Sequence, residues 1–188
     1  MALTDTKQAV MMAARSMVQS RGYNSLSYRD LGKEVGIKSS SIHYYFPSKG
    51  NLGAALTHEY TDDFLSYLNE MLAASPNWKH SINSYADVFR ATLVRDNRMC
   101  LGGIMAAEHT DLDVEIRNEV ERFTELLVQW LTGVLQQGNQ EMESATLKKW
   151  AFGIFAAIEG AQLVARGCGD VAVYDHILDA YRTAGLLP

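Results

Sequence analysis

The 188-residue chain contains only two cysteines, Cys100 and Cys168, and three prolines. Two cysteines are too few for a disulfide framework, and a protein of this size with reduced thiols is typical of the cytoplasm. The first ten residues, MALTDTKQAV, lack a basic start followed by an apolar segment. We therefore expect no secretion signal and a cytoplasmic location.

Long hydrophobic runs and long alternating runs are also missing. The longest weakly polar stretch, residues 150–165, includes Glu159 and Gln162, and is too short and too polar to cross a bilayer. Apolar residues instead recur at helical spacing in most windows. With 47% hydrophobic residues, the chain can bury a sizeable core, and the pattern predicts an all-α protein.

Motifs of common enzyme classes are absent as well. The sequence has no glycine-rich phosphate loop, HExxH, GxSxG or CxxC, so we expect neither catalysis nor a cofactor. Glu108, His109, Asp111 and Asp113 could imitate a metal-binding cluster. No second ligand set accompanies them, and their spacing fits a helix cap better, so we expect no metal site.

Charge is distributed unevenly along the chain. The net charge is −5, but residues 1–52 contain seven basic and three acidic residues, which gives +4. The remaining residues contain ten basic and nineteen acidic residues, which gives −9. This asymmetry is expected when one end of a protein meets phosphates and the other does not.

Residues 28–46, YRDLGKEVGIKSSSIHYYF, read as two short helices joined by a glycine turn. Leu31, Val35, Ile37, Ile42 and Tyr45 are spaced to form a small shared core. A glycine follows Val35, where the chain must reverse within a few residues and a positive φ is least costly. The pattern predicts a helix-turn-helix module, which places its second helix in the major groove of DNA.

The outward face of that second helix supplies candidate contacts with DNA. We expect base edges and phosphates to be met by its polar and aromatic residues, and phosphates by residues flanking the module. The candidates on the helix are Lys38, Ser39, Ser40, Ser41, His43 and Tyr44, and those for phosphate are Ser27, Tyr45 and Lys49.

Helical periodicity and capping residues predict nine helices. The first ends before Gly22, Ser27 caps the second, and Ser48 caps a long fourth helix. Asp111 or Asp113 caps the seventh. The expected ranges are about 4 or 5–21, 28–35, 38–45, 49–74, 78–95, 100–108, 112 or 114–138, 144–165 and 171–184.

Residues 7–55, which include AARSMVQSRGYNSLSYRDLGKEVGIKSSSIHYYFPSKGNL, resemble the tetracycline-repressor (TetR) family of bacterial transcription regulators. The shared features are a first helix ending in glycine and an aromatic residue, a capped second helix, and an aromatic cluster closing with Phe-x-Ser-Lys. Gly50 departs from the pattern, because an acidic residue commonly follows the lysine. NRMCLGGIMAAEH is similar to a subgroup with Cys-Leu at the start of the sixth helix.

The resemblance implies a homodimeric, ligand-responsive regulator, most simply a repressor that a small molecule releases from a near-palindromic DNA operator. Residues 1–50 would bind DNA, and residues 51–188 would bind the effector and form the dimer. An alternative is that Cys100 senses electrophiles or oxidants, since Arg95 and Arg98 precede it. A helical adaptor that binds protein and not DNA is a different class.

Candidate residues of the sensor region come from helical spacing. Polar groups in a mostly apolar effector pocket would include Glu108, His109 and Gln162. Small residues near the C-terminus predict close helix packing between two copies. The lining candidates are Phe89, Leu93, Cys100, Met105, His109, Phe123, Trp130 and Trp150. The dimer candidates are Gly153, Ala157, Gly160, Ala161, Tyr174, Ile177 and Tyr181.

Overall fold

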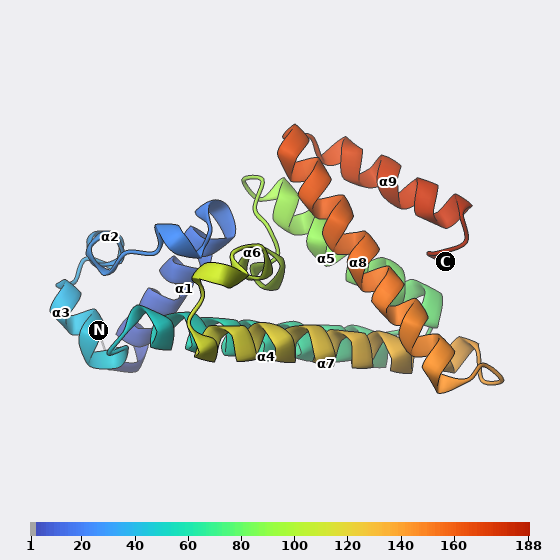
Figure 1. The fold of residues 1–188 in the computed structure, drawn as a ribbon, viewed down its shortest axis with the longest axis horizontal. Helices are drawn as coiled ribbons and strands as arrows, with labels where there is room; N and C mark the ends of the chain where they lie inside the picture. The colour runs from blue at the N-terminus through green and yellow to red at the C-terminus, as the bar shows by residue number, and fades with distance from the viewer. Residues whose placement is uncertain (1–2) are drawn as a thin grey trace. The chain divides into compact units, whose positions relative to one another are not determined.

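The computed structural model describes the backbone of residues 3–188 and side chains from residue 5 onward (Figure 1). Every regular element in this part of the chain is helical, which confirms the all-α prediction. No described helix is long and apolar enough to cross a membrane. The elements are α1 (Leu3–Arg21), η1 (Tyr23–Ser25), α2 (Tyr28–Val35), α3 (Ser39–Tyr45), α4 (Lys49–Ala74), α5 (Trp78–Val94), α6 (Leu101–Ala107), η2 (His109–Asp111), α7 (Val114–Gly138), α8 (Ser144–Cys168) and α9 (Val171–Thr183).

The predicted helix boundaries agree with these elements to within about one turn. Ser27 caps α2, since its hydroxyl accepts from the Asp30 amide at 3.4 Å. Ser48 and Asn51 cap α4 reciprocally, because each side chain accepts from the other residue's amide, at 3.0 and 3.2 Å. The eighth helix is longer than predicted and continues to Cys168, where Gly169 adopts a left-handed conformation with φ of 65°.

Contacts divide the chain into two compact units. The first unit comprises Met1–Thr61 with Leu101–Phe123, and the second comprises Asp62–Cys100 with Thr124–Pro188. Helices α4 and α7 each run from one unit into the other without a break. The predicted boundary at residue 50 was based on function and not on contacts, and it stays a prediction.

The core of the first unit fixes the crossing of α2 and α3. Leu31 and Ile42 are completely buried there, and Phe46 is nearly so. A Cβ on Gly32 would lie 2.7 Å from the carbonyl oxygen of Ile37, so only glycine permits this approach of the two helices. Gly36 ends α2 with φ of 77°, as the predicted turn requires.

The second unit is built around aromatic residues of α4 and α5 and the pair formed by α8 and α9, which lie side by side (Figure 1). Tyr85 packs against Phe89 with ring centroids 5.0 Å apart, and Phe64 stacks on Tyr85 at 6.0 Å. Tyr174 of α9 is completely buried and donates its hydroxyl hydrogen to the carbonyl of Ala86 on α5 at 2.8 Å. These contacts form a second core.

Gly102 in α6 gives a direct test of packing in the first unit. An added Cβ would overlap the buried ring of Phe123, whereas one on Gly133 of α7 would meet nothing within 4 Å. We expect Gly102→Ala to lower the free energy of unfolding by about 1–3 kcal/mol. Gly133→Ala should raise it by about 0.5–1 kcal/mol, because alanine favours the helix. Chemical denaturation measures both, and equal effects would contradict the packing.

Candidate nucleic-acid interface and sensor region

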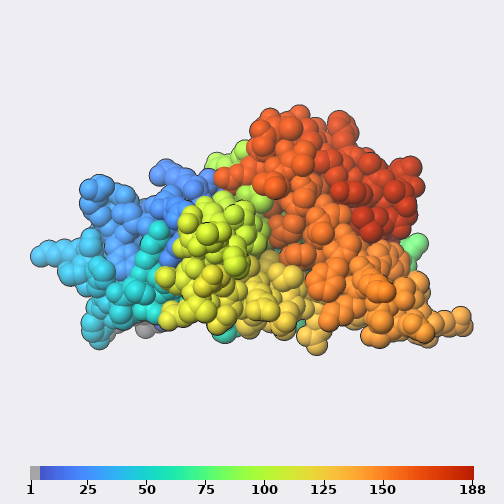
Figure 2. Space-filling view, viewed as in Figure 1, coloured from blue at the N-terminus to red at the C-terminus, as the bar shows by residue number. Residues whose placement is uncertain are grey.

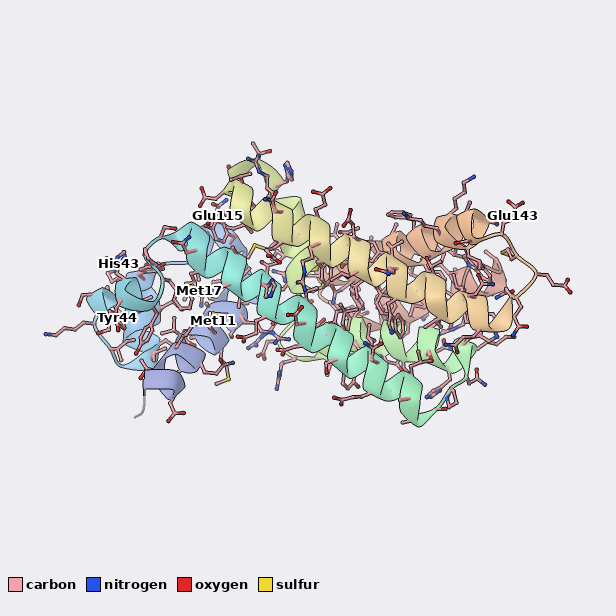
Figure 3. The ribbon with its side chains drawn as sticks, turned by 90° about the horizontal axis from the view of Figure 1, so that it is seen from below. Met11, Met17, His43, Tyr44, Glu115 and Glu143 are labelled. Atoms are coloured by element: carbon pink, nitrogen blue, oxygen red, sulfur yellow. The ribbon has the colours of Figure 1, made fainter. Side chains whose placement is uncertain are left out.

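The outward face of α3 is polar and solvent-exposed. Lys38, Ser40, Ser41 and His43 are exposed, and Tyr44 is 77% exposed. Figure 3 labels His43 and Tyr44 on this face. An exposed aromatic side chain beside hydroxyls can make apolar contact with a thymine methyl while the hydroxyls meet base edges or phosphates. The structure therefore presents these five predicted residues on the surface.

The other four predicted DNA contacts are half-buried. Ser27 caps α2, and the Ser39 hydroxyl donates to the Tyr28 carbonyl at 3.4 Å. Tyr45 packs edge-on against Tyr44, with ring centroids 5.3 Å apart. The hydroxyls of Ser27 and Ser39 therefore already have roles within the protein. Arg29, the second residue of α2, was not predicted to contact DNA, although its side chain is 78% exposed. Its position in the first turn, close to the cap Ser27, could have identified it as a candidate.

Lys49 occupies an internal position within the first unit. Its ammonium lies 4.2 Å from the centre of the Tyr23 ring and 3.5 Å from the carbonyl oxygen of Asn24. Burial lowers the pKa of Lys49, while the nearby carboxylates of Glu108 and Asp113 raise it. A phosphate contact by Lys49 stays a prediction, and it requires the side chain to leave these partners.

A group of polar contacts, here named the polar bridge, connects the segment after α1 with the segment after α6. Glu108 accepts from the amide of Asn24 at 3.0 Å, and the Asn24 side chain donates to Asp111 at 2.8 Å. Gly22 has φ of 86°, and a Cβ there would overlap the Glu108 carboxylate. Two of the carboxylates that resembled a metal cluster in the sequence, Glu108 and Asp111, therefore accept hydrogen bonds from Asn24.

The polar bridge continues along the start of α4 and α7. The carboxylate of Asp113 lies against Gly50, where a Cβ would overlap it, which explains why a small residue follows Lys49. Asn51 donates to Glu115 at 3.0 Å, and His58 lies 3.1 Å from Glu119. Sequence reasoning missed these pairs because their members lie about 60 residues apart, although the glycines at 22 and 50 mark the close approaches.

The predicted effector-lining residues fall into both units. Met105, His109 and Phe123 belong to the first unit, and the other five belong to the second. Those other five are Phe89, Leu93, Cys100, Trp130 and Trp150. His109 is exposed, the remaining two of the first unit are buried, and the assignment of all eight to a pocket stays a prediction.

Gln162 and the tryptophans of the second unit have hydrogen-bond partners within the protein. Gln162 accepts from the Cys100 amide at 2.8 Å and donates to the Phe89 carbonyl at 2.9 Å and to the Thr92 hydroxyl. Trp130 donates to Asn69 at 3.1 Å, and Trp150 donates to the Leu186 carbonyl at 2.8 Å. These polar atoms stabilise the unit itself.

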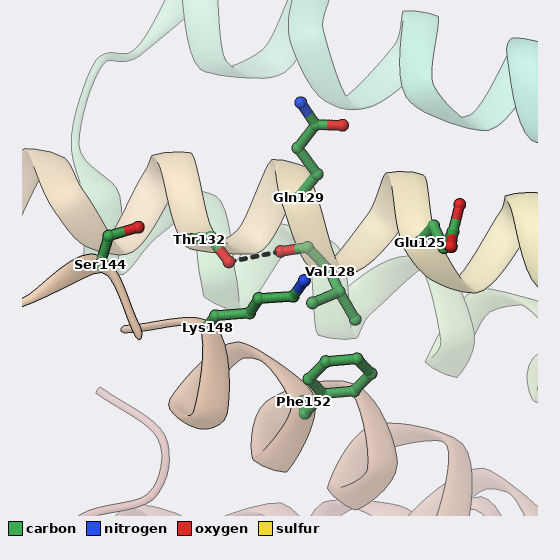
Figure 4. A pocket seen from close by; sticks show the side chains of 7 residues that line it. All are labelled: Glu125, Val128, Gln129, Thr132, Ser144, Lys148 and Phe152. Carbon is green, nitrogen blue, oxygen red and sulfur yellow. Dashed lines mark hydrogen bonds between the residues drawn. The ribbon is translucent and has the colours of Figure 1, made fainter. Parts of the chain in front are cut away.

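A surface groove of about 460 Å³ lies between α7 and α8 of the second unit (Figure 4). It is lined by Glu125, Val128, Gln129, Thr132, Ser144, Lys148 and Phe152. None of the predicted lining residues belongs to it. Glu125 on α7 and Lys148 on α8 give its two walls opposite charges, and Phe152 is 45% exposed. Such a groove suits contact with a protein or a small molecule on the surface rather than an enclosed binding site.

Burial changes the interpretation of the small residues in α8. Ala157 and Ala161 are buried within the chain, as is Tyr174 of α9, whereas Gly153 is half-buried, and a Cβ there would lie 3.4 Å from Leu186. The premise that this face has no partner within the chain is therefore wrong for the two alanines and the tyrosine. A different stripe of α8 remains on the surface, at spacings of three and four residues: Phe152, Ala156, Gly160 and Leu163.

Glu159 was not among the predicted site residues. Its carboxylate oxygens are buried, and no N–H or O–H donor of the described part of the chain reaches either of them. Burial raises the pKa of Glu159 from 4.5 to about 7, although a hydrogen bond from the Cys100 thiol, a weak donor, lowers it. Helical periodicity could not reveal this, because glutamate at a partly exposed helical position usually extends into water.

Comparison with known proteins places the chain in a family. A model described as bacterial regulatory proteins, tetR family, matches residues 10–56. A TetR transcriptional regulator from Legionella pneumophila is 32% identical over 95% of this chain and 96% of that one, with a TM-score of 0.88. The chain belongs to the TetR family. It is a helix-turn-helix transcriptional regulator.

Other family structures share the fold. A TetR-family regulator from Agrobacterium tumefaciens is 27% identical, covers 94% of this chain and 95% of that chain, and has a TM-score of 0.88. The regulator FadR from Bacillus subtilis, solved with stearoyl-CoA, is 18% identical with a TM-score of 0.72, covering 92% and 95%. No curated protein sequence matches the chain. The family assignment therefore rests on the Legionella regulator.

Glu159 predicts a specific dependence of stability on pH. Because the folded-state pKa is raised, stabilisation by the neutral carboxyl is complete below pH 4.5 and is lost as pH rises through about 7. The shift corresponds to about 3 kcal/mol. We expect Glu159→Gln to be more stable than wild type at pH 8 by up to this amount, and the two proteins to converge near pH 4.5. Urea denaturation across this range measures the difference, with the exposed Glu125→Gln as control.

Proposed function

We propose that this regulator is a homodimeric repressor that binds a near-palindromic operator and is released by a small-molecule effector. The observation that supports DNA binding most strongly is the exposed polar face of α3 on a core that fixes its crossing with α2. Two such faces related by a dyad require half-sites about one helical turn apart, or a multiple of that distance. Residues 1–50 would bind DNA, and residues 51–188 would sense and dimerise.

Dimerisation is supported by the surface stripe of α8. Phe152 is 45% exposed and Leu163 is 58% exposed, and α8 forms part of the surface visible in Figure 2, in orange. A Cβ on Gly160 would meet nothing within 4 Å in the single chain, so a second helix could approach closely there. Of the predicted dimer residues, the half-buried Gly153, Gly160, Ile177 and Tyr181 remain candidates.

Release by an effector requires two states with different affinities for DNA. The polar bridge would couple α6, in the proposed effector-binding region, to the helix-turn-helix module. It links Asn24, directly after α1, with Glu108, directly after α6. A shift of α6 would therefore act on the support of α2 and α3. FadR, solved with stearoyl-CoA, is a relative of this fold with a bound small molecule.

We do not expect the effector of this chain to be as anionic as stearoyl-CoA. Residues 53–188 carry a net charge of −9, which disfavours a strongly anionic ligand. The structure also weakens the alternative in which Cys100 reacts as a thiolate. Cys100 is only 1% exposed, and a thiolate would share its buried space with the carboxylate of Glu159, a like charge.

Gel retardation with genomic fragments tests the proposed function. A regulator selects discrete fragments over competitor DNA, whereas a protein-binding adaptor retards none and nonspecific binding retards all. Selection of discrete fragments is the expected result. Absence of selection would contradict the proposal.

Substitutions in α3 and α4 separate base reading from phosphate binding. Lys49→Ala should weaken binding to all sequences similarly and reduce the salt slope by about one unit, because phosphate charge is the same everywhere. Ser40→Ala and Tyr44→Ala should instead change the preference among operator variants, each by about 1–3 kcal/mol at one base pair. Fluorescence anisotropy over a series of salt concentrations measures both effects. A reversal of the two patterns would contradict the assigned roles.

A charged residue at Gly160 tests the dimer. Gly160→Glu has room within the single chain, but in a symmetric dimer it would face its own copy, where like charges cost several kcal/mol. We expect the dissociation constant to rise by about 100-fold or more. Sedimentation equilibrium measures this, with Gly133→Glu on α7 as the matched control. An unchanged dimer would exclude this stripe, and monomeric wild type at micromolar concentration would exclude the dimer.

A further inference from the structure

Glu159 has an arrangement that the fold alone does not require. The residue keeps some exposure through its backbone and stem, yet its carboxylate is turned inward and both oxygens are buried. Among the described residues, the Cys100 thiol is the one donor beside them, and a thiol is a weak donor. A buried carboxylate without strong donors costs free energy, and a side chain this long could reach water instead. Its inward orientation therefore leaves a strong acceptor without a matching donor.

The other buried polar groups around Glu159 are satisfied within the protein. Gln162, one turn later on α8, makes its hydrogen bonds to Cys100, Phe89 and Thr92. Tyr174 of α9, close enough for Glu159 to raise its pKa, donates to the Ala86 carbonyl. Apart from the weak thiol donor of Cys100, Glu159 is thus an acceptor among groups whose donors are already used.

A ligand that completes this site must supply what is missing, namely hydrogen-bond donors, preferably with positive charge. Protonated amines and amidines do both, and amidines can pair with both carboxylate oxygens at once. A neutral amide or alcohol of the same shape supplies donors without charge. An anion would be repelled.

We propose that Glu159 is the recognition group for a cationic nitrogen, an ammonium or amidinium, on the effector of this regulator. The proposal rests on the function proposed above and adds the chemical class of the ligand. The position of Glu159 also suits a sensor. It contacts Cys100, whose amide is tied to Gln162 and which directly precedes α6, the helix that ends at the polar bridge.

The test uses the full-length protein without DNA and a panel of amines and amidines of graded size. Each cation is paired with a neutral partner of the same shape, for example benzamidine with benzamide and benzylamine with benzyl alcohol. Isothermal titration calorimetry at pH 7 measures the affinities for wild type, Glu159→Gln and the control Glu121→Gln, which changes an exposed residue of α7 outside the groove. Buffers with different heats of ionisation report the protons released. Circular dichroism confirms that each variant is folded.

We expect at least one cation to bind wild type and Glu121→Gln 10-fold or more tightly than its neutral partner, and Glu159→Gln to lose this preference. Because the pKa of Glu159 is about 7, binding should release about half a proton per site at pH 7. No preference for any cation, or an equal preference in Glu159→Gln, would overturn the proposal. Since no operator takes part, a cation preference without operator selection would leave this site standing and contradict the proposed function instead.

Discussion

The close approach of α2 and α3 at Gly32 is the constraint on which DNA recognition depends. It brings the Gly32 Cα to the Ile37 carbonyl, so that Leu31 and Ile42 can be buried in one small core. With its apolar face committed to that core, α3 turns its polar face to solvent. The same principle operates in the polar bridge, where the absence of a Cβ at Gly22 gives the Glu108 carboxylate room to reach Asn24. Glycines therefore determine both the packing of α2 against α3 and the contact between the segments after α1 and after α6.

The buried polar groups of the second unit are of two kinds. Those with complete hydrogen bonding, such as Gln162 and Tyr174, fix the packing of α5, α8 and α9. Glu159 lacks such partners, and this is a cost that a ligand can remove. An effector can shift an equilibrium only through a difference in affinity between two states. A buried carboxylate beside the start of α6 provides such a difference if the two states expose it differently.

Much of the fold could be predicted from the sequence because its determinants are local. The caps Ser27 and Ser48, the turn at Gly36 and helical periodicity act within a few residues, and each was found where predicted. Contacts between distant segments could not be predicted in this way. Periodicity did not show that Ala157 and Ala161 pack inside the chain, or that Glu108 accepts from Asn24, because both depend on tertiary packing. Glu159 was missed for the same reason.

The central claim is that two copies of this chain read one DNA site through paired α3 helices. The most direct measurement selects binding sites from a random DNA library and then weighs the selected complex by native mass spectrometry. The account predicts an inverted repeat, with half-site centres about one helical turn apart or a multiple of it, and at least one pair of chains on each site. A single unrepeated half-site bound by one chain would contradict it.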